Sequence, residues 1–187
     1  METLKVILLI VLGLVVLLAI VAMFLKKKYS VEREVIINKS VADVFKYVKL
    51  LKNQENYAVW SKRDVNVRRD FKGTDATVGF TSSWSSDVKE VGVGEQEIKN
   101  IVANKRIDTE LRFMKPMKAV CQAYIATESA GTNKAKVKWG FSGKMCYPMN
   151  LMLACTKMEK MMGKDLEDGL LNLKMILEKE HKTEKEE

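Results

Sequence analysis

The stretch MEKMMGKDLEDGLLNLKMILEK, residues 158–179, carries an apolar stripe through an otherwise charged segment. Its apolar residues recur three or four positions apart, which predicts a long amphipathic helix with one buried face. Gly163 and Gly169 interrupt the stripe, although each glycine costs roughly 1 kcal/mol relative to alanine inside a helix. We therefore expect another element to approach the helix closely at these two points. The four methionines of this stretch are flexible enough to fill irregular gaps or to contact varied ligands.

The predicted helix begins near Pro148 and ends near Lys179. Upstream of it the apolar residues alternate with polar ones, which is typical of strands in an antiparallel sheet with one covered face. The long helix is the only large apolar segment left to cover that face, so the fold class is α+β. The buried stripe of the helix comprises Leu151, Cys155, Met158, Met162, Leu166, Leu170, Leu173 and Leu177. The predicted strands cover residues 31–37, 65–71, 76–85, 91–102, 105–114, 117–128 and 134–144.

Two short helices are expected between the first and second strands. Ser40 precedes VADVFKYVKLL and has Asp43 three residues later, which resembles a capping box at a helix start. A second short helix or turn, with Asn53 and Asn56, runs up to Trp60. A strand, two short helices, six strands and one long helix are thus predicted in that order.

This order resembles the START-like, helix-grip superfamily, and several segments resemble its polyketide cyclase/dehydrase-like SRPBCC branch. They are VIINKSVADVFKYV (35–48), the segment from Trp84 to Ile98, LRFMKPMKA (111–119), WGFSG (139–143) and the helix segment 158–174, which is most similar to bacterial members. The resemblance implies a curved antiparallel sheet of about seven strands around the C-terminal helix, with a cavity between them. The sequence departs from the family at residues 57–63, where a turn rich in tryptophan and proline is common.

The N-terminal segment predicts a membrane anchor. Val6 to Leu25 form 20 residues without charge or proline, enough for a helix of about 30 Å that spans a bilayer core. A cleaved signal peptide fits poorly, because the segment is too long and is not followed by small residues. Lys26, Lys27 and Lys28 follow it, and an excess of lysine marks the cytoplasmic side. We therefore predict a single-pass membrane protein with a cytoplasmic domain, divided into residues 1–28 (anchor), 29–179 (START-like domain) and 180–187 (charged tail).

Several functional classes find no support in the sequence. The net charge of +8 is spread along the chain rather than clustered with aromatic residues, so no nucleic-acid partner is expected. The only histidine is His181, in the charged tail, and Cys121, Cys146 and Cys155 lack the CxxC spacing. No catalytic dyad, triad or metal site can therefore be assembled, and no cofactor is expected. The sequence favours a role without catalysis.

The predicted function is to bind a small hydrophobic or lipid-like ligand between the sheet and the C-terminal helix. One alternative is a cyclase or dehydratase acting on a polyketide-like substrate, and a second is a scaffold or chaperone-modulating domain without catalysis. Gln96 has two interpretations: it pairs with a neighbouring group, or it orients the ligand. The predicted cavity lining comprises Trp60, Phe80, Trp84, Gln96, Ile98, Leu111, Phe113, Cys121, Ile125, Trp139, Phe141, Met158, Met162 and Leu166.

Overall fold

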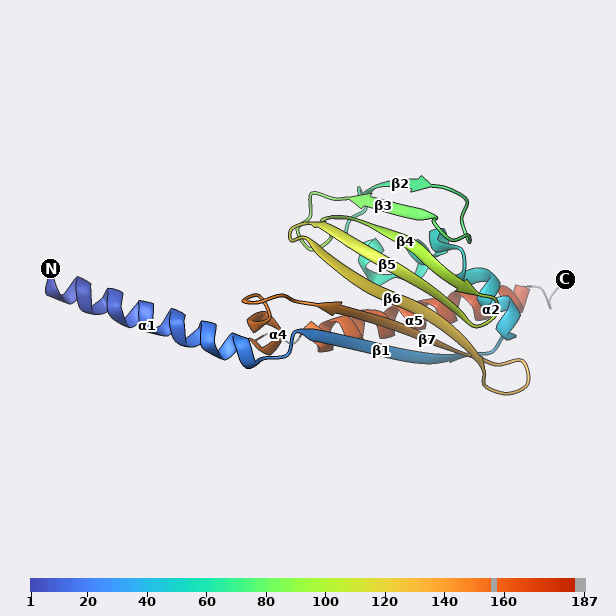
Figure 1. Ribbon diagram of the computed structural model, residues 1–187. Helices are drawn as coiled ribbons and strands as arrows, with labels where there is room; N and C mark the ends of the chain where they lie inside the picture. Colours follow the sequence, from blue (N-terminus) through green and yellow to red (C-terminus); the bar gives the residue numbers. More distant parts are fainter. Residues whose placement is uncertain (156–157, 184–187) are drawn as a thin grey trace.

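The computed structural model describes residues 1–155 and 158–183, without the side chains of 154–155 and 180–183. The predictions for the Cys155 side chain and for the side chains of the charged tail 180–187 therefore lie outside the described residues. An N-terminal helix, α1 (Glu2–Phe24), extends away from a domain in which a curved sheet faces a long helix, α5 (Met158–Thr183) (Figure 1). The α+β helix-grip fold predicted from the sequence is confirmed.

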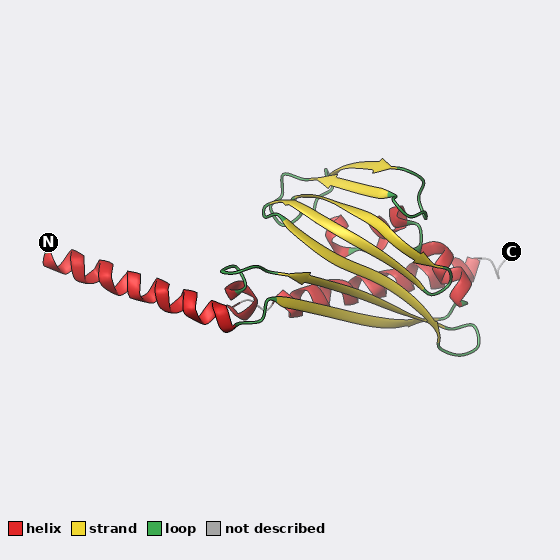
Figure 2. Ribbon diagram, in the orientation of Figure 1, coloured by secondary structure: helices red, strands yellow, loops and turns green. Residues whose placement is uncertain are grey.

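Seven strands form one antiparallel sheet in the order β1-β7-β6-β5-β4-β3-β2, and the helices of the domain lie on one side of it (Figure 2). Every strand after β2 pairs with the strand that precedes it, and β1 closes the other edge by pairing with β7. The strands are β1 (Lys28–Ile37), β2 (Arg68–Lys72), β3 (Thr81–Ser85), β4 (Val93–Val102), β5 (Arg106–Lys115), β6 (Ala119–Ser129) and β7 (Ala135–Lys144).

Three strand starts differ from the prediction by three residues or more, and one of them is that of β2, which begins at Arg68 rather than at residue 65. The strand expected from residue 76 begins only at Thr81, because Ala76 (φ 59°) and Gly79 (φ 90°) adopt left-handed conformations that interrupt an extended chain. At the other edge, β1 begins at Lys28, three residues earlier than predicted and almost directly after α1. The anchor-like helix and the first strand are therefore joined by a very short connection.

The single helix predicted from Pro148 is described as two, α4 (Leu151–Cys155) and α5. The inner face of α5 packs on the sheet through Leu166, Leu170, Leu173 and Leu177, all of them buried as the stripe predicts.

Gly163 and Gly169 permit the close approach that the sequence suggests. A Cβ at Gly163 would collide with the guanidinium of Arg33 on β1, and a Cβ at Gly169 would lie 2.8 Å from the Trp139 ring on β7. The two glycines thus allow α5 to pack closely against β1 at Gly163 and against β7 at Gly169.

Short helices fill the space beside α5. Ser40 begins α2 (Val41–Val48), where its Oγ accepts a hydrogen bond from the Asp43 backbone N–H at 3.2 Å, as the capping pattern predicts. The chain then forms η1 (Leu51–Asn53), α3 (Gln54–Tyr57) and η2 (Val59–Lys62). The Asn172 side chain on α5 donates to the Tyr57 carbonyl at 3.1 Å, and this bond fixes the end of α3 against the long helix.

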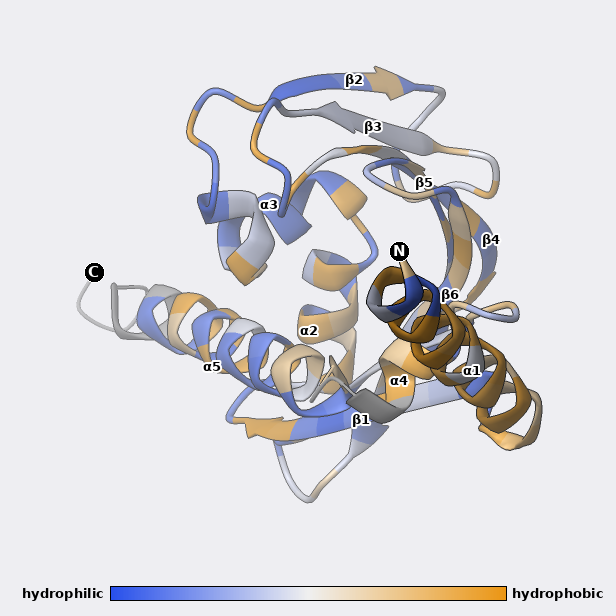
Figure 3. Ribbon diagram, turned by 90° about the vertical axis from the view of Figure 1, so that its left-hand side faces the viewer, coloured by the Kyte–Doolittle hydropathy of each residue, from blue (hydrophilic) through white to orange (hydrophobic). Residues whose placement is uncertain are grey.

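The helix α1 is long and apolar enough to cross a membrane, and it is hydrophobic on all sides (Figure 3). Asn150, which is completely buried, connects its end to the domain: Asn150 Nδ2 donates to the carbonyls of Ala22 (2.6 Å) and Leu25 (3.3 Å). These are carbonyls of the last helical turn and its cap, which have no partner within a helix.

Candidate functional site

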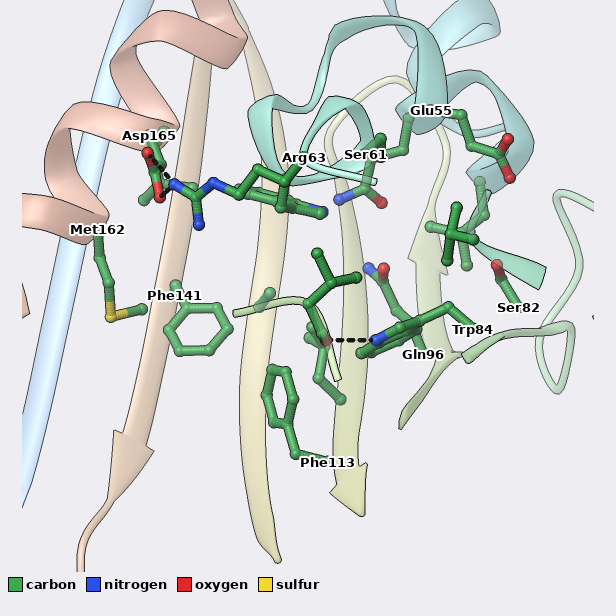
Figure 4. Close-up of a pocket in the computed structure, with 18 of the residues that line it drawn as sticks. Glu55, Ser61, Arg63, Ser82, Trp84, Gln96, Phe113, Phe141, Met162 and Asp165 are labelled. Atoms are coloured by element: carbon green, nitrogen blue, oxygen red, sulfur yellow. Dashed lines mark hydrogen bonds and ion pairs between the residues drawn. The ribbon is translucent and has the colours of Figure 1, made fainter. Parts of the chain in front are cut away.

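A cavity of about 300 Å³ lies between the sheet, the α3–η2 segment and the N-terminal half of α5 (Figure 4). This volume is at the lower end of the range for small-molecule sites. Strands β2 to β7 contribute the floor, and Trp60, Arg63, Met162 and Asp165 lie on the helical side.

Aromatic side chains form much of the cavity wall. Trp84 and Phe113 meet edge to face with ring centroids 5.7 Å apart, and Trp60 and Trp139 lie 5.1 Å apart. Trp84 lies directly over Gly94 of the neighbouring strand, where a Cβ would be 2.6 Å from the ring, and its indole N–H donates to the Val91 carbonyl at 3.1 Å. The ring is thereby fixed in place before any ligand arrives.

Gln96, Ser82 and Glu55 lie on the opposite side of the cavity from Met162 and Phe141, whereas Arg63 and Asp165 lie near Met162 (Figure 4). Ser82 and Gln96 are cross-strand partners on β3 and β4, and both line the cavity. Gln96 Nε2 donates to the Thr109 hydroxyl at 3.0 Å, and Thr109 in turn donates to the Ala123 carbonyl at 3.3 Å. Half of the Gln96 amide is thus held by the sheet, as the first interpretation expects, while its Oε1 accepts no hydrogen bond within the described chain.

Two ion pairs stand at the rim. Arg63 holds Asp165 through one nitrogen, at 2.7 and 2.8 Å from the two carboxylate oxygens, and so links the end of η2 to α5. Arg69 Nε lies 3.2 Å from Glu55 Oε1, which is close enough for an ion pair but not aligned for a hydrogen bond. Both arginines of the cavity wall are therefore already neutralised.

The structure places nine of the fourteen predicted lining residues in the cavity wall. They are Trp60, Trp84, Gln96, Leu111, Phe113, Trp139, Phe141, Met162 and Leu166.

The other five lie elsewhere. Phe80, Ile98 and Ile125 are buried in the hydrophobic core beyond the cavity. Cys121 faces inward, but its sulfur lies 3.4 Å from the Tyr29 hydroxyl. Both the sulfur and the hydroxyl lie next to Gly143 on β7. Burial raises the pKa of the Cys121 thiol, which disfavours a reactive thiolate. Met158 is half-buried, one helical turn before Met162 and outside the cavity.

Several cavity residues were not predicted, although the sequence pattern could have identified some of them. Ser82 shares the strand face of Trp84, and Ala123 shares that of Cys121, so strand alternation alone would have included both. No sequence pattern could have identified the Arg63–Asp165 pair, because the two residues are 102 positions apart in the sequence. Gln54 lies on a helix of only four residues, too short for a helical pattern.

The paired glutamates of β4 face away from the cavity. Glu95 and Glu97, together with Glu110 on β5, surround Arg112 at 2.6–2.7 Å. Hydrogen bonds from Lys99 and Arg112 lower the pKa of Glu97, and the carboxylates raise the pKa of Arg112. They are a surface ion network rather than a general acid–base pair. The described residues contain no cluster of His, Cys, Asp or Glu that could hold a metal ion.

No protein-family model and no curated protein matches the sequence. Solved structures match well. Protein MLL2253 from Mesorhizobium loti has a TM-score of 0.58 at 15% identity, with 81% of this chain and 98% of that chain covered. Norcoclaurine synthase from Thalictrum flavum has a TM-score of 0.59 at 9% identity, and the match covers 81% of this chain and 87% of that chain. Aha1 from Colwellia psychrerythraea has a TM-score of 0.51 at 15% identity, and the match covers 78% of this chain and 93% of that chain. The chain therefore has the START-like, or Bet v1-like, helix-grip fold.

Proposed function

We propose that this protein binds a small, mostly apolar ligand between its sheet and α5, and that α1 anchors it in a bilayer with the domain in the cytoplasm. The cavity carries the proposal: about 300 Å³ lined by six aromatic or sulfur-containing side chains with a few polar groups. Such a lining is typical of sites for small apolar molecules. The six are Trp60, Trp84, Phe113, Trp139, Phe141 and Met162.

The position of the cavity favours a ligand that comes from the membrane. The ends of β5 and β7 and the start of α5 all lie on the side of the domain that faces α1 (Figure 1). Phe113 on β5 and Met162 on α5 line the cavity near these ends. A hydrophobic molecule would have only a short path through water.

A cyclase- or dehydratase-type reaction on a polyketide-like substrate is the competing function. Norcoclaurine synthase shares the fold and was solved in complex with dopamine and hydroxybenzaldehyde, so the fold can accommodate small aromatic molecules. General acid–base catalysis needs a titratable group within reach of the substrate. Here Glu55 and Asp165 are each paired with an arginine, and Glu90, the third carboxylate of the cavity wall, is exposed to solvent, which favours binding over catalysis.

A scaffold or chaperone-modulating role without catalysis is the second alternative. A scaffold needs no internal cavity and would be expected to fill its interior with side chains. The open cavity favours ligand binding over this role.

Tryptophan fluorescence offers a direct test, because all three tryptophans of the chain line the cavity and none lies in α1. We expect 1-bromododecane, added to the full chain in lipid nanodiscs, to quench this fluorescence, since bromine quenches indole at short range. The matched control is Ala123→Phe, which fills the cavity from β6 and should abolish the quenching. A folded wild-type protein that is not quenched would exclude the proposed function.

A further inference from the structure

The cavity wall contains two buried polar side chains that the protein itself leaves without a partner. Gln54 is 7% exposed and Ser82 is 8% exposed, and both line the cavity. Neither side chain makes a hydrogen bond to any other residue that the structure describes. Their polar atoms are not among the fully buried atoms that lack a partner, so they remain accessible and can bond a ligand in the cavity in place of water.

Gln54 and Ser82 belong to one polar corner. Gln96 pairs with Ser82 across the strands, and its Oε1 is likewise without a hydrogen bond in the described chain. Gln54 and Gln96 also share a small hollow of about 10 Å³ behind the main cavity, which places the two amides on the same side. Three side chains from α3, β3 and β4 thus converge with donors and acceptors available.

The charges around this corner select against an ionised ligand group. Arg69 is paired with Glu55, and Arg63 is paired with Asp165, so neither offers a free positive charge to a phosphate or carboxylate. Glu55 Oε1 is also buried without a hydrogen bond. An anion brought here would lose its hydration without gaining a counter-ion, which is costly.

We infer that Gln54, Ser82 and Gln96 form a binding site for the uncharged polar end of an amphiphile, such as an alcohol or an ester carbonyl. The hydrocarbon part then lies along Phe113, Phe141 and Met162. This inference rests on the proposed function and adds the chemical class and the orientation of the ligand. The polar end of the ligand then lies at the β3–β4 side of the cavity, and its hydrocarbon part lies across the sheet, toward β7 and α5.

The test uses three competitors with the same chain, measured as displacement of 1-bromododecane from the full chain in nanodiscs at equal mole fractions. We expect 1-dodecanol to bind at least about tenfold more tightly than dodecane or dodecyl phosphate. Gln54→Leu should reduce the preference for the alcohol to about threefold or less, while the affinity for dodecane stays equal or rises. Ser82→Ala should reduce the preference in the same direction.

Gln122→Leu is the matched control, because Gln122 is an exposed glutamine on β6 that donates to Glu110 on the outer face. It should leave the preference unchanged. Equal binding of dodecanol and dodecane by the wild-type protein would overturn the inference while leaving the proposed function intact. A Gln54→Leu protein that keeps the full preference for the alcohol would also overturn the inference. If Gln54→Leu does not fold, a Ser82→Ala protein that keeps the full preference would overturn it instead. Absence of quenching by 1-bromododecane itself would instead reject the proposed function.

Discussion

Tyr57 has one part that stabilises the core and another part that destabilises it. Its ring is completely buried, edge to face with Trp139 at 5.4 Å between centroids, and it lies beside Tyr47. Its hydroxyl, however, is buried and has no hydrogen-bond partner among the described residues. The ring stabilises the contact between α3 and the sheet, and the hydroxyl opposes it.

Tyr57→Phe should therefore raise the free energy of unfolding by about 1 kcal/mol, because it removes only the unsatisfied hydroxyl. Urea unfolding of the full chain in detergent micelles, followed by tryptophan fluorescence, measures this change. Tyr47→Phe is the control: the Tyr47 hydroxyl accepts a hydrogen bond from Asn56 at 3.2 Å, so its removal should bring no gain. A loss of stability in Tyr57→Phe would mean that the hydroxyl has a partner, such as a bound water.

The same variant should change the response to alkali. Burial raises the pKa of Tyr57 above the ordinary value of about 10, so above that pH the unfolded chain has released a proton that the native protein retains. Stability is then fully present below about pH 10 and falls as the pH rises, by up to about 1.4 kcal/mol per pH unit for this group. Tyr57→Phe should show a shallower alkaline loss in the same unfolding assay. Part of the slope should remain, because burial also raises the pKa of Tyr29.

At the scale of elements, the two glycines of α5 make a matched pair. Gly169→Ala places a methyl group 2.8 Å from the Trp139 ring and 3.5 Å from the Tyr57 carbonyl, and neither can move easily. We expect a loss of about 1–3 kcal/mol, despite the better helix propensity of alanine. Gly163→Ala meets only the end of the Arg33 side chain, which can swing aside, so its effect should be within about 1 kcal/mol of zero. Thermal unfolding of both variants compares them, and equal losses would contradict this account of the packing.

The elements also show what the sequence could and could not predict. Alternation identified the inner faces of the strands, which is why Trp84, Leu111 and Trp139 were placed correctly on the concave side. It gave no measure of depth along a strand, so Phe80 and Ile98 were expected in the cavity although they lie in the core beyond it. Cys121 was expected to line the cavity, but its sulfur lies against the Tyr29 hydroxyl on the distant strand β1. Contacts between residues 92 or more positions apart leave no local pattern to detect.

The connection between α1 and the domain depends on Asn150. Asn150→Leu removes both hydrogen bonds to the end of α1 and leaves a buried carbonyl without a partner, at a cost of about 1–3 kcal/mol. We expect trypsin to cleave the Lys26–Lys28 segment about tenfold faster in this variant, because the junction opens more often. Asn66→Ala, in a surface loop, is the control. Unchanged cleavage in Asn150→Leu would mean that the Asn150 bonds do not hold the junction.

For the molecule as a whole, the short connection determines how the domain would stand on a bilayer. Only residues 25–27 separate the end of α1 from the start of β1, a reach of about 10 Å at most. If α1 spans the bilayer, the side of the domain that bears Met114, Met117 and Met149 must lie close to the membrane surface. These methionines are exposed, and Lys115 and Lys118 lie between or beside them. An apolar rim with adjacent lysines suits an interface with anionic lipid headgroups.

The side of the membrane on which the domain lies can be determined by cysteine labelling. The lysine triplet after α1 predicts that the domain is cytoplasmic, because an excess of lysine marks the cytoplasmic side of a membrane helix. Thr132→Cys places a thiol in the exposed β6–β7 turn, at the end of the sheet away from α1, in a background with Cys146 and Cys155 changed to Ser (Figure 1). Cys121 is buried and serves as an internal blank. A membrane-impermeant maleimide should label this variant in inside-out vesicles and spare it in right-side-out vesicles. Thr3→Cys, at the opposite end of α1, should give the reverse pattern, and labelling of Thr132→Cys in right-side-out vesicles would place the domain outside the cell.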